Sequence, residues 1–117
     1  MNLNMDMIRH RNTLVARLVG ELDHHTADKV RIMLEDEIGR GDCRHLVLSL
    51  ESLQFMDSSG IGVILGRYKQ IKLKGGKMVI CGVNPQVYRL LEMSGLFKIM
   101  AVYENEATAL TELEVAL

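Results

Sequence analysis

Residues 55–62 read Phe-Met-Asp-Ser-Ser-Gly-Ile-Gly, and they mark the point where an expected strand gives way to an expected helix. The apolar run Leu46–Leu50 precedes this stretch, and the amphipathic segment Val63–Leu73 follows it. The run is apolar on both faces, which is typical of a central strand covered from both sides. Ligands of open α/β sheets commonly bind where such strands end, so this junction is the candidate functional site.

The residues at the start of the chain predict two strands joined by a turn. Leu3–Met7 alternates apolar with polar residues, which is the pattern of a strand with one buried face. Thr13–Val19 reads as a second strand, and His10–Asn12 suits a short hairpin turn, so we expect the two strands to be antiparallel. Gly20 is expected to end the second strand.

A helix ending near Ile38 is expected next, because apolar residues there recur at spacings of three and four. Asp23 or Thr26 can cap its start by accepting a hydrogen bond from a backbone N–H group. Gly39 and Gly41 are expected to end it, since glycine tolerates the left-handed conformation that is common at helix ends.

The second half of the chain continues the alternation of helices and strands. A helix ending at Leu73 is expected first, followed by a strand at Lys77–Cys81. The next helix is expected to be capped by Asn84 and ended by Gly95, and a strand at Ile99–Val102 follows it. The terminal helix is expected to be capped by Asn105 and has the apolar positions Leu110, Leu113 and Leu117. The order β-β-α-β-α-β-α-β-α predicts an α/β fold whose strands are mainly parallel.

Parallel strands joined by right-handed crossovers place their strand-to-helix loops at one edge of the sheet. The loops Gly20–Thr26, Glu51–Ser59 and Gly82–Pro85 are therefore expected to lie on one rim. Ligands and partners of open α/β sheets commonly bind on that rim, which makes it the surface where function is expected.

The composition is that of an ordinary globular chain. Its 117 residues suit one domain, 1–117, with 48% hydrophobic and 25% charged residues. The net charge of -1 gives no global attraction to nucleic acid or anionic membranes, and no apolar run approaches the roughly 20 residues of a membrane span. Two cysteines are too few for a disulfide scaffold or a zinc site. We expect a cytoplasmic protein without direct nucleic-acid binding or membrane insertion.

Asp57, Ser58 and Ser59 are each able to cap the helix that follows them, although only one cap is needed. A cap alone would explain one of the three, with about 1 kcal/mol of helix stability as its purpose. A serine at a helix N-terminus is also a good phosphate site, because unpaired N–H groups and the helix dipole stabilise added negative charge. The junction is therefore a candidate phosphorylation site.

The helix after the junction contains Gly60, Gly62 and Gly66. Each interior glycine costs roughly 0.5–1 kcal/mol of helix stability relative to alanine. Glycines kept at such a cost indicate a backbone that is approached closely, either by the sheet or by a partner.

Other chemistry fits the junction less well. A hydrolase nucleophile elbow needs Gly-x-Ser-x-Gly, and Met56 occupies the first glycine position for Ser58. Asp57 as a phosphoacceptor of the receiver type would need an acidic pair after an early strand, which the sequence lacks. His24 and His25 are adjacent and have no partner at a metal-binding spacing, so no metal site is expected. The basic residues between positions 67 and 77 suit a helix C-terminus and lack the interleaved aromatics of nucleic-acid binding.

Two blocks of the sequence resemble the signature motifs of the STAS family, which includes anti-sigma factor antagonists and a domain of sulfate transporters. The blocks are Gly20-Glu21-Leu22-Asp23 and Asp57-Ser58-Ser59-Gly60-Ile61-Gly62, and the resemblance extends over nearly the whole chain. One departure is Ile61, where leucine is more usual. The resemblance implies a STAS-type mixed, mainly parallel sheet of about five strands with four helices.

The resemblance also implies a function. An anti-sigma factor antagonist is not an enzyme and has no cofactor of its own. Its unphosphorylated form, monomeric when free, binds an anti-sigma factor that is a serine kinase and so releases a sporulation sigma factor. The kinase uses ATP to phosphorylate the first serine of the block, here Ser58, and a serine phosphatase reverses the reaction.

The residues around that serine would then contact the partner: Glu21, Asp23, His24, Thr26, Asp57, Ser59 and Ile61. Glu21 and Asp23 are included because the topology places them on the same rim as Ser58. The alternative function is that of a STAS module that binds a nucleotide or an anion directly.

Overall fold

The computed structural model describes the backbone of residues 2–116 and the side chains of residues 2–114. The strands are β1 (Leu3–His10), β2 (Thr13–Leu22), β3 (His45–Met56), β4 (Met78–Cys81) and β5 (Val102–Tyr103). The helices are α1 (Ala27–Ile38), α2 (Ser58–Leu73), α3 (Pro85–Ser94) and α4 (Glu106–Ala116), with a 3₁₀ turn at Leu96–Lys98. The predicted order of strands and α-helices is confirmed.

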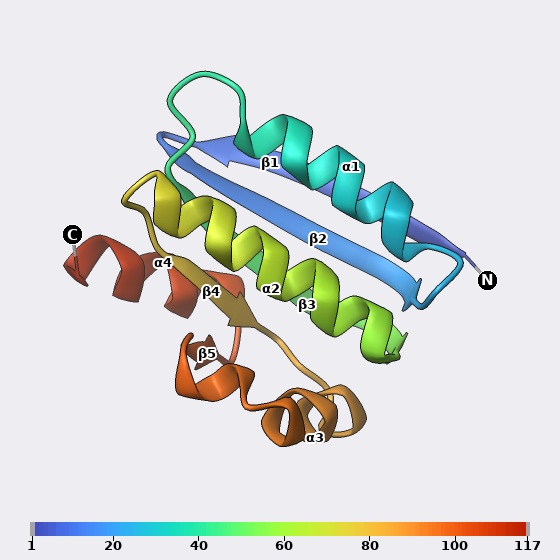
Figure 1. Cartoon of the computed structure of the whole chain (residues 1–117). Helices are drawn as coiled ribbons and strands as arrows, with labels where there is room; N and C mark the ends of the chain where they lie inside the picture. The colour runs from blue at the N-terminus through green and yellow to red at the C-terminus, as the bar shows by residue number, and fades with distance from the viewer. Residues whose placement is uncertain (1, 117) are drawn as a thin grey trace.

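The strands form one sheet in the order β1-β2-β3-β4-β5 (Figure 1). β1 pairs antiparallel with β2, and the other neighbours are parallel, so the predicted mixed and mainly parallel sheet is confirmed. β2 and β3 pair from Thr13 opposite His45 to Leu22 opposite Met56. Because these two strands end together, the loops that follow them lie next to each other.

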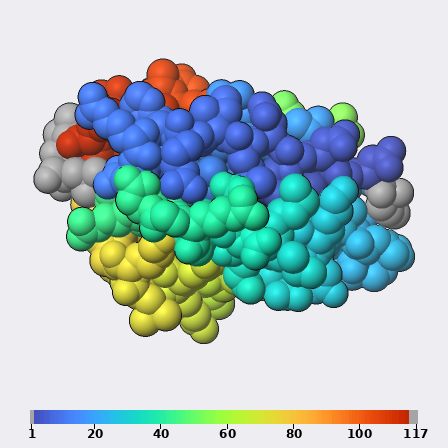
Figure 2. Space-filling model, turned by 90° about the horizontal axis from the view of Figure 1, so that it is seen from above, coloured from blue at the N-terminus to red at the C-terminus, as the bar shows by residue number. Residues whose placement is uncertain are grey.

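Helices α1, α2 and α3 pack on one face of the sheet, and α4 packs on the other. The larger core cluster includes Leu34 of α1, Ile64 of α2 and Leu91 of α3. The smaller cluster joins Ala109 and Leu113 of α4 to strand residues on the opposite face. Seen from the β1 edge, the blue strands lie between the cyan and yellow residues of α1 and α2 and the orange-red C-terminal residues (Figure 2). Among the described residues, no helix has the length and apolar character needed to cross a bilayer.

Gly20 does not end β2, contrary to the prediction. The strand continues to Leu22 because it has neighbours on both sides, with Leu3 and Leu53 both opposite Gly20. A Cβ atom at position 20 would lie 2.2 Å from the carbonyl oxygen of Asn2, and the residue has φ +114°. The glycine is therefore required by the close approach of β1 and by its own backbone conformation, which only glycine adopts readily.

β3 is much longer than the predicted strand Leu46–Leu50, because it continues to Met56. The predicted loop Glu51–Ser59 is therefore wrong over the segment Glu51–Met56, which pairs with β2. Strand pairing outweighs the polar character of this segment, since each paired residue satisfies backbone groups that would otherwise need water. Only the residues from Asp57 onward form the rim at this position.

The last predicted strand, Ile99–Val102, is confirmed as an element, but its bounds are wrong. The 3₁₀ turn Leu96–Lys98 occupies the chain just before it, and β5 consists only of Val102–Tyr103. Within the part of the chain that the structure describes, β5 is an edge strand that pairs with β4 at Ile80 and Cys81, so little pairing is available to extend it.

The predicted helix ends are mostly confirmed. Asn84 caps α3 by accepting a hydrogen bond from the N–H of Val87, and Gly95 ends that helix with a left-handed φ of +84°. Asn105 accepts a hydrogen bond from Thr108 at the start of α4, while the predicted apolar position Leu117 lies outside the described residues. Gly39 ends α1 with φ -73°, so the left-handed conformation predicted there is wrong, and only Gly41, at φ +55°, adopts it.

Candidate functional site

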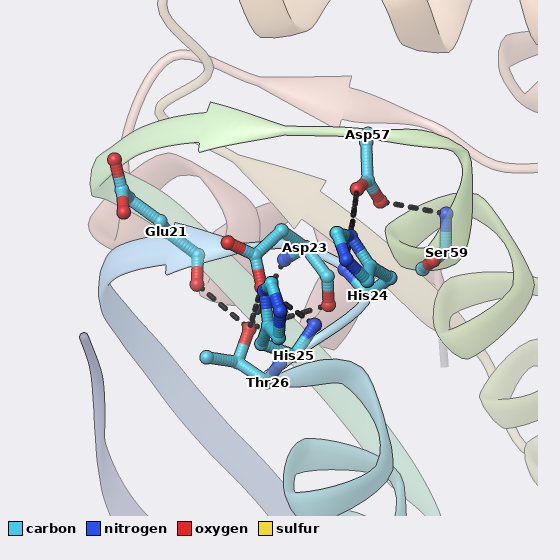
Figure 3. A network of polar contacts seen from close by, with 7 residues as sticks. All are labelled: Glu21, Asp23, His24, His25, Thr26, Asp57 and Ser59. Atoms are coloured by element: carbon cyan, nitrogen blue, oxygen red, sulfur yellow. Dashed lines mark hydrogen bonds and ion pairs between the residues drawn. The ribbon is translucent and has the colours of Figure 1, made fainter. Parts of the chain in front are cut away.

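Asp57 connects the two neighbouring rim loops (Figure 3). It is the N-cap residue of α2, and its Oδ1 accepts a hydrogen bond of 2.8 Å from the N–H of Ser59. Its Oδ2 accepts one of 3.1 Å from the N–H of His24, in the loop before α1. Its own N–H donates to the carbonyl oxygen of Leu22 at the end of β2. One carboxylate therefore fixes both the start of α2 and the position of the β2–α1 loop.

Ser58 is the first residue of α2, and its side chain is exposed. The sequence left open whether Asp57 or Ser58 caps the helix, and Asp57 does so. The Ser58 hydroxyl is thus not required for capping. Ser59 is half-buried, and its N–H is held by Asp57. The two serines are therefore not equivalent, because only Ser58 is exposed.

The environment of Asp57 favours its ionised form. Partial burial opposes ionisation, but the hydrogen bonds from Ser59 and His24 outweigh it and lower the pKa of Asp57 below its ordinary value. The start of α2 adds the positive end of a helix dipole. The junction consequently carries a fixed negative charge next to the exposed hydroxyl of Ser58.

The β2–α1 loop is closed by its own polar side chains (Figure 3). Asp23 is 2% exposed, and its Oδ1 accepts hydrogen bonds from the N–H groups of His25 at 2.8 Å and Thr26 at 3.1 Å. The Thr26 hydroxyl donates to the carbonyl oxygen of Glu21 and accepts from the N–H of Asp23. Thr26 occupies the N-cap position of α1 without a side-chain capping bond. Asp23 and Thr26 therefore shape this loop from within.

The structure brings the predicted site residues to one rim, but not in equivalent roles. His24 is exposed, with its Nδ1 atom 3.6 Å from Oδ2 of Asp57. Glu21 is half-buried at the end of β2, opposite Phe55, and Ile61 is half-buried on α2. Direct partner contacts by Asp23 and Thr26 stay predictions, as do those by the other residues.

The three glycines of α2 differ in what surrounds them. A Cβ atom at Gly60 would lie 2.5 Å from Cγ of Met56 and 3.1 Å from Cδ2 of Leu22, so the sheet approaches the helix closely at this point. At Gly62 and Gly66 a Cβ atom would meet nothing within 4 Å. Close approach by the sheet therefore explains Gly60, and approach by a partner remains a prediction for the other two.

Sequence reasoning missed the backbone partners of the site. The N–H groups of His24 and His25 are bound by carboxylates, and the Leu22 carbonyl is bound by Asp57. Asp23 and Thr26 lie in a loop before a helix, and Asp and Thr side chains commonly bond nearby backbone groups in such loops, which is the signal that could have predicted these bonds. No residue pattern marks the bond between Asp57 and His24, because 33 positions separate them.

Within the described part of the chain, no group of three or more His, Cys, Asp or Glu side chains is arranged to hold a metal ion. The candidate site is thus best described by its exposed serine, its fixed carboxylate and the loop that the carboxylate holds.

The sequence matches the STAS domain family over residues 4–109. It is 64% identical to the "Anti-sigma F factor antagonist" of Paenibacillus polymyxa, over 98% of each chain. The structure resembles that of the anti-sigma factor antagonist SpoIIAA in its unphosphorylated form, with a TM-score of 0.74, 28% identity, and 97% of this chain and 98% of that one covered. It also resembles the Bacillus cell fate determinant SpoIIAA in its phosphorylated form, with a TM-score of 0.74, 31% identity, and coverage of 95% and 98%.

These matches span nearly all of both chains and include both blocks that surround the junction. The five-stranded mixed sheet with four helices agrees with the fold of those relatives. The chain belongs to the STAS domain family.

Proposed function

We propose that this chain is an anti-sigma factor antagonist that is controlled by phosphorylation of Ser58. The unphosphorylated form binds an anti-sigma factor that is itself a serine kinase, and a sporulation sigma factor is released. The kinase transfers phosphate from ATP to Ser58, and the complex dissociates. A serine phosphatase restores the active form. The chain itself is regulatory, acts in the cytoplasm, and supplies no catalytic group or cofactor.

The observation that carries this proposal is the exposure of Ser58 beside a carboxylate that already caps the helix. A kinase active site needs to reach a serine hydroxyl, and a hydroxyl used for capping would have to leave its hydrogen bond first. The relative with 64% identity is named an anti-sigma F factor antagonist, and SpoIIAA is described in both phosphorylated and unphosphorylated forms. These names support the assignment of the same activity to this chain.

The position of Ser58 also fits a switch that acts on an interface instead of the core. A phosphate at the first residue of α2 adds about -1.5 to -2 charges to the rim. The helix dipole and the N–H groups of the first turn favour that charge, so the fold tolerates it. The carboxylate of Asp57, held by Ser59 and His24, stays in place next to it. A partner surface that fits the neutral hydroxyl would then face a bulky dianion.

The outer surface of α2 adds room for a partner. Gly62 and Gly66 follow Ser58 at spacings of four residues, which places all three on one face of the helix. No atom would contact a Cβ at either glycine. A partner backbone can therefore approach this face more closely than it could approach larger side chains.

The test is incubation of the chain with its anti-sigma kinase and ATP, followed by mapping of the phosphate by mass spectrometry. We expect one phosphate on Ser58 in the native chain and none in Ser58→Ala. That variant should still bind the kinase with affinity close to that of the unphosphorylated native chain. Ser59→Ala is the matched control, because it removes a neighbouring hydroxyl and should leave phosphorylation in place.

Phosphate found mainly on Ser59, or on neither serine, would overturn the assignment. Tight binding of a nucleotide by the chain alone, measured by calorimetry without the kinase, would favour the alternative of a ligand-binding STAS module.

A further inference from the structure

A groove of about 680 Å³ lies where β4, β5 and α3 meet the outer half of β3. β4 pairs with β3 only over Leu46–Ser49, and β5 pairs with only two residues of β4. Within residues 2–116, β3 continues to Met56 with no strand paired to it on that side beyond Ser49. The groove therefore lies beside the unpaired edge of the outer half of β3. Glu51, Gly82, Tyr88, Tyr103 and Glu104 are among the residues that line it.

The floor of the groove is held by close packing at Gly82. A Cβ atom at this position would lie 1.8 Å from Cγ of Glu51, and Gly82 has φ +70°. Gly82 therefore lets the chain turn away from β4 directly against the stem of Glu51. The side chain of Asn84 donates a hydrogen bond of 2.8 Å to the carbonyl oxygen of Leu53, which ties the next residues to β3.

The walls combine aromatic rings with negative charge. The ring of Tyr88 packs against that of Phe97, with ring centroids 4.7 Å apart, so it is held in place although it is 40% exposed. Glu51 and Glu104 are both exposed, and among the described residues neither forms a salt bridge. None of the described residues that line the groove is a lysine or an arginine.

Glu106 differs from Glu51 and Glu104 because its carboxylate has a cationic partner within the chain. Glu106, two residues after Glu104, receives hydrogen bonds of 2.7 and 2.8 Å from the guanidinium of Arg17. Its charge is therefore matched within the chain. Glu51 and Glu104 line the groove without such a match among the described residues, so their carboxylates are open to a cation from outside.

We propose that this groove binds an arginine or lysine side chain of a basic segment in a partner protein. The apolar stem of such a side chain packs along Val83 and Val102, and its cation lies between Glu51 and Glu104. The rings of Tyr88 and Tyr103 also line the groove and add cation–π attraction. The volume lies within the range of ordinary ligand sites and exceeds that of one side chain, so it accommodates the neighbouring residues of the segment as well.

The groove is separate from the proposed phosphorylation site. Glu51 and Asp57 lie on one continuous stretch of chain, about 20 Å apart at the rise of an extended strand. The inference goes beyond the proposed function, because it requires neither the kinase nor phosphorylation of Ser58. Its test can therefore fail or succeed independently.

The probe is Nα-acetyl-arginine amide, titrated into the ¹⁵N-labelled full chain and followed by two-dimensional NMR. We expect the amide signals of Gly82, Tyr103 and Glu104 to shift and saturate. Nα-acetyl-citrulline amide, which has nearly the same shape but no charge, should bind about fivefold more weakly, since two exposed ion pairs together contribute roughly that factor.

The double variant Glu51→Gln with Glu104→Gln should weaken binding of the arginine probe by about fivefold as well. Glu92→Gln is the matched control, because this exposed carboxylate on α3 is outside the groove, and its removal should leave the affinity unchanged. Unshifted signals elsewhere in the spectrum will show that the double variant is folded. Equal response to both probes, signals that shift around Asp57 instead, or unchanged affinity in the double variant would each overturn the proposal.

Discussion

The two neighbouring strand-to-helix junctions are built from the same kinds of polar residue but use them differently. In the β2–α1 junction, Asp23 and Thr26 are buried, and their side chains bond within the loop. In the β3–α2 junction, Asp57 provides the cap and the bridge to His24, and Ser58 stays exposed. The first junction is a structural element, and the second presents a reactive group on a fixed support.

This difference shows that helix capping and partner recognition can be separated on one rim. A polar residue that is already bonded inside a loop contributes to stability, and its replacement should lower the free energy of unfolding. An exposed polar residue next to a completed cap should affect binding with little effect on stability. Substitutions at the first junction should therefore lower the free energy of unfolding, and substitutions at Ser58 should instead lower the affinity for the partner.

The largest expected effect is on partner binding by Ser58→Asp. We expect the affinity for the anti-sigma kinase to fall about a thousandfold, which corresponds to about 4 kcal/mol. The thermal midpoint should stay nearly unchanged, because a carboxylate at the first turn of a helix is compatible with the helix dipole. Calorimetric titration with the kinase and thermal unfolding of the variant measure the two quantities.

Gln86→Asp is a suitable control for that experiment. Gln86 is exposed in the first turn of α3, so the change adds a carboxylate at a comparable position of another helix. Kinase affinity should stay within about twofold of the native value, because surface changes away from an interface rarely matter. A large drop in the thermal midpoint of Ser58→Asp would mean that the serine is structural, and the contrast between the junctions would be lost.

Asp23→Ala should give the largest loss of stability. The change leaves the part-buried N–H of His25 without its acceptor and removes one of the two acceptors of the Thr26 N–H, which keeps the carbonyl oxygen of residue 23. We expect the free energy of unfolding to fall by about 2 kcal/mol. Urea denaturation of the variant measures the loss. Asp23→Asn keeps an oxygen acceptor in the same place and should lose less than about 1 kcal/mol.

Equal losses for the two Asp23 variants would show that charge, not hydrogen bonding, governs the loop. A loss near zero for Asp23→Ala would contradict the interpretation of this junction as structural.

The extent to which the sequence predicts this fold depends on the range of the interactions. The cap at Asn84 and the left-handed Gly95 were predictable, because their signals lie within a few residues. The outer half of β3 was not, because Glu51–Met56 is strand only through its pairing with β2, more than 30 positions away in the chain. Local residue preference has no access to such pairing.

The features of the candidate site also fall into two groups, those that local sequence predicts and those that depend on residues far apart in the chain. Asp57 and Ser58 stand out in the sequence because several capping residues crowd one helix start. The bond from His24 to Asp57 does not stand out, since its donor is a backbone group in another loop. The sequence predicts close approach at all three glycines of α2 without deciding between the sheet and a partner, and the structure shows the sheet close to Gly60.

Gly60 and Gly62 lie on different faces of α2, and alanine substitutions should distinguish the face that packs on the sheet from the face that is open to a partner. Gly60→Ala should lower the free energy of unfolding by about 1–2 kcal/mol, because the new methyl group would lie 2.5 Å from Cγ of the buried Met56. Gly62→Ala meets no atom within 4 Å and should raise it by about 0.5–1 kcal/mol, the usual gain of replacing glycine inside a helix. Urea denaturation compares both variants with the native chain.

If Gly62→Ala also weakens kinase binding while it stabilises the fold, the outer face of α2 is part of the interface. Stabilisation by both substitutions would mean that Met56 yields readily, and that the sheet does not require a glycine at position 60.

The smallest expected effect is the pH dependence contributed by Asp57. Its pKa is lowered in the folded state, so its ionisation stabilises the fold above the ordinary carboxyl pKa of about 3.9, and this contribution is lost as the pH falls through the folded value. Asp57→Asn lacks the charge, and its single amide oxygen can accept from Ser59 or from His24 but not from both, since the other position holds an NH₂ donor. The part of its stability loss that is due to charge should be about 0.5–1 kcal/mol at pH 6. Urea denaturation at pH 6, 4 and 3 should show the two curves converging as the pH falls, because the native carboxylate then becomes neutral too. A constant difference at all three pH values would mean that amide geometry, and not charge, separates the variants, and the fixed negative charge beside Ser58 would lose its support.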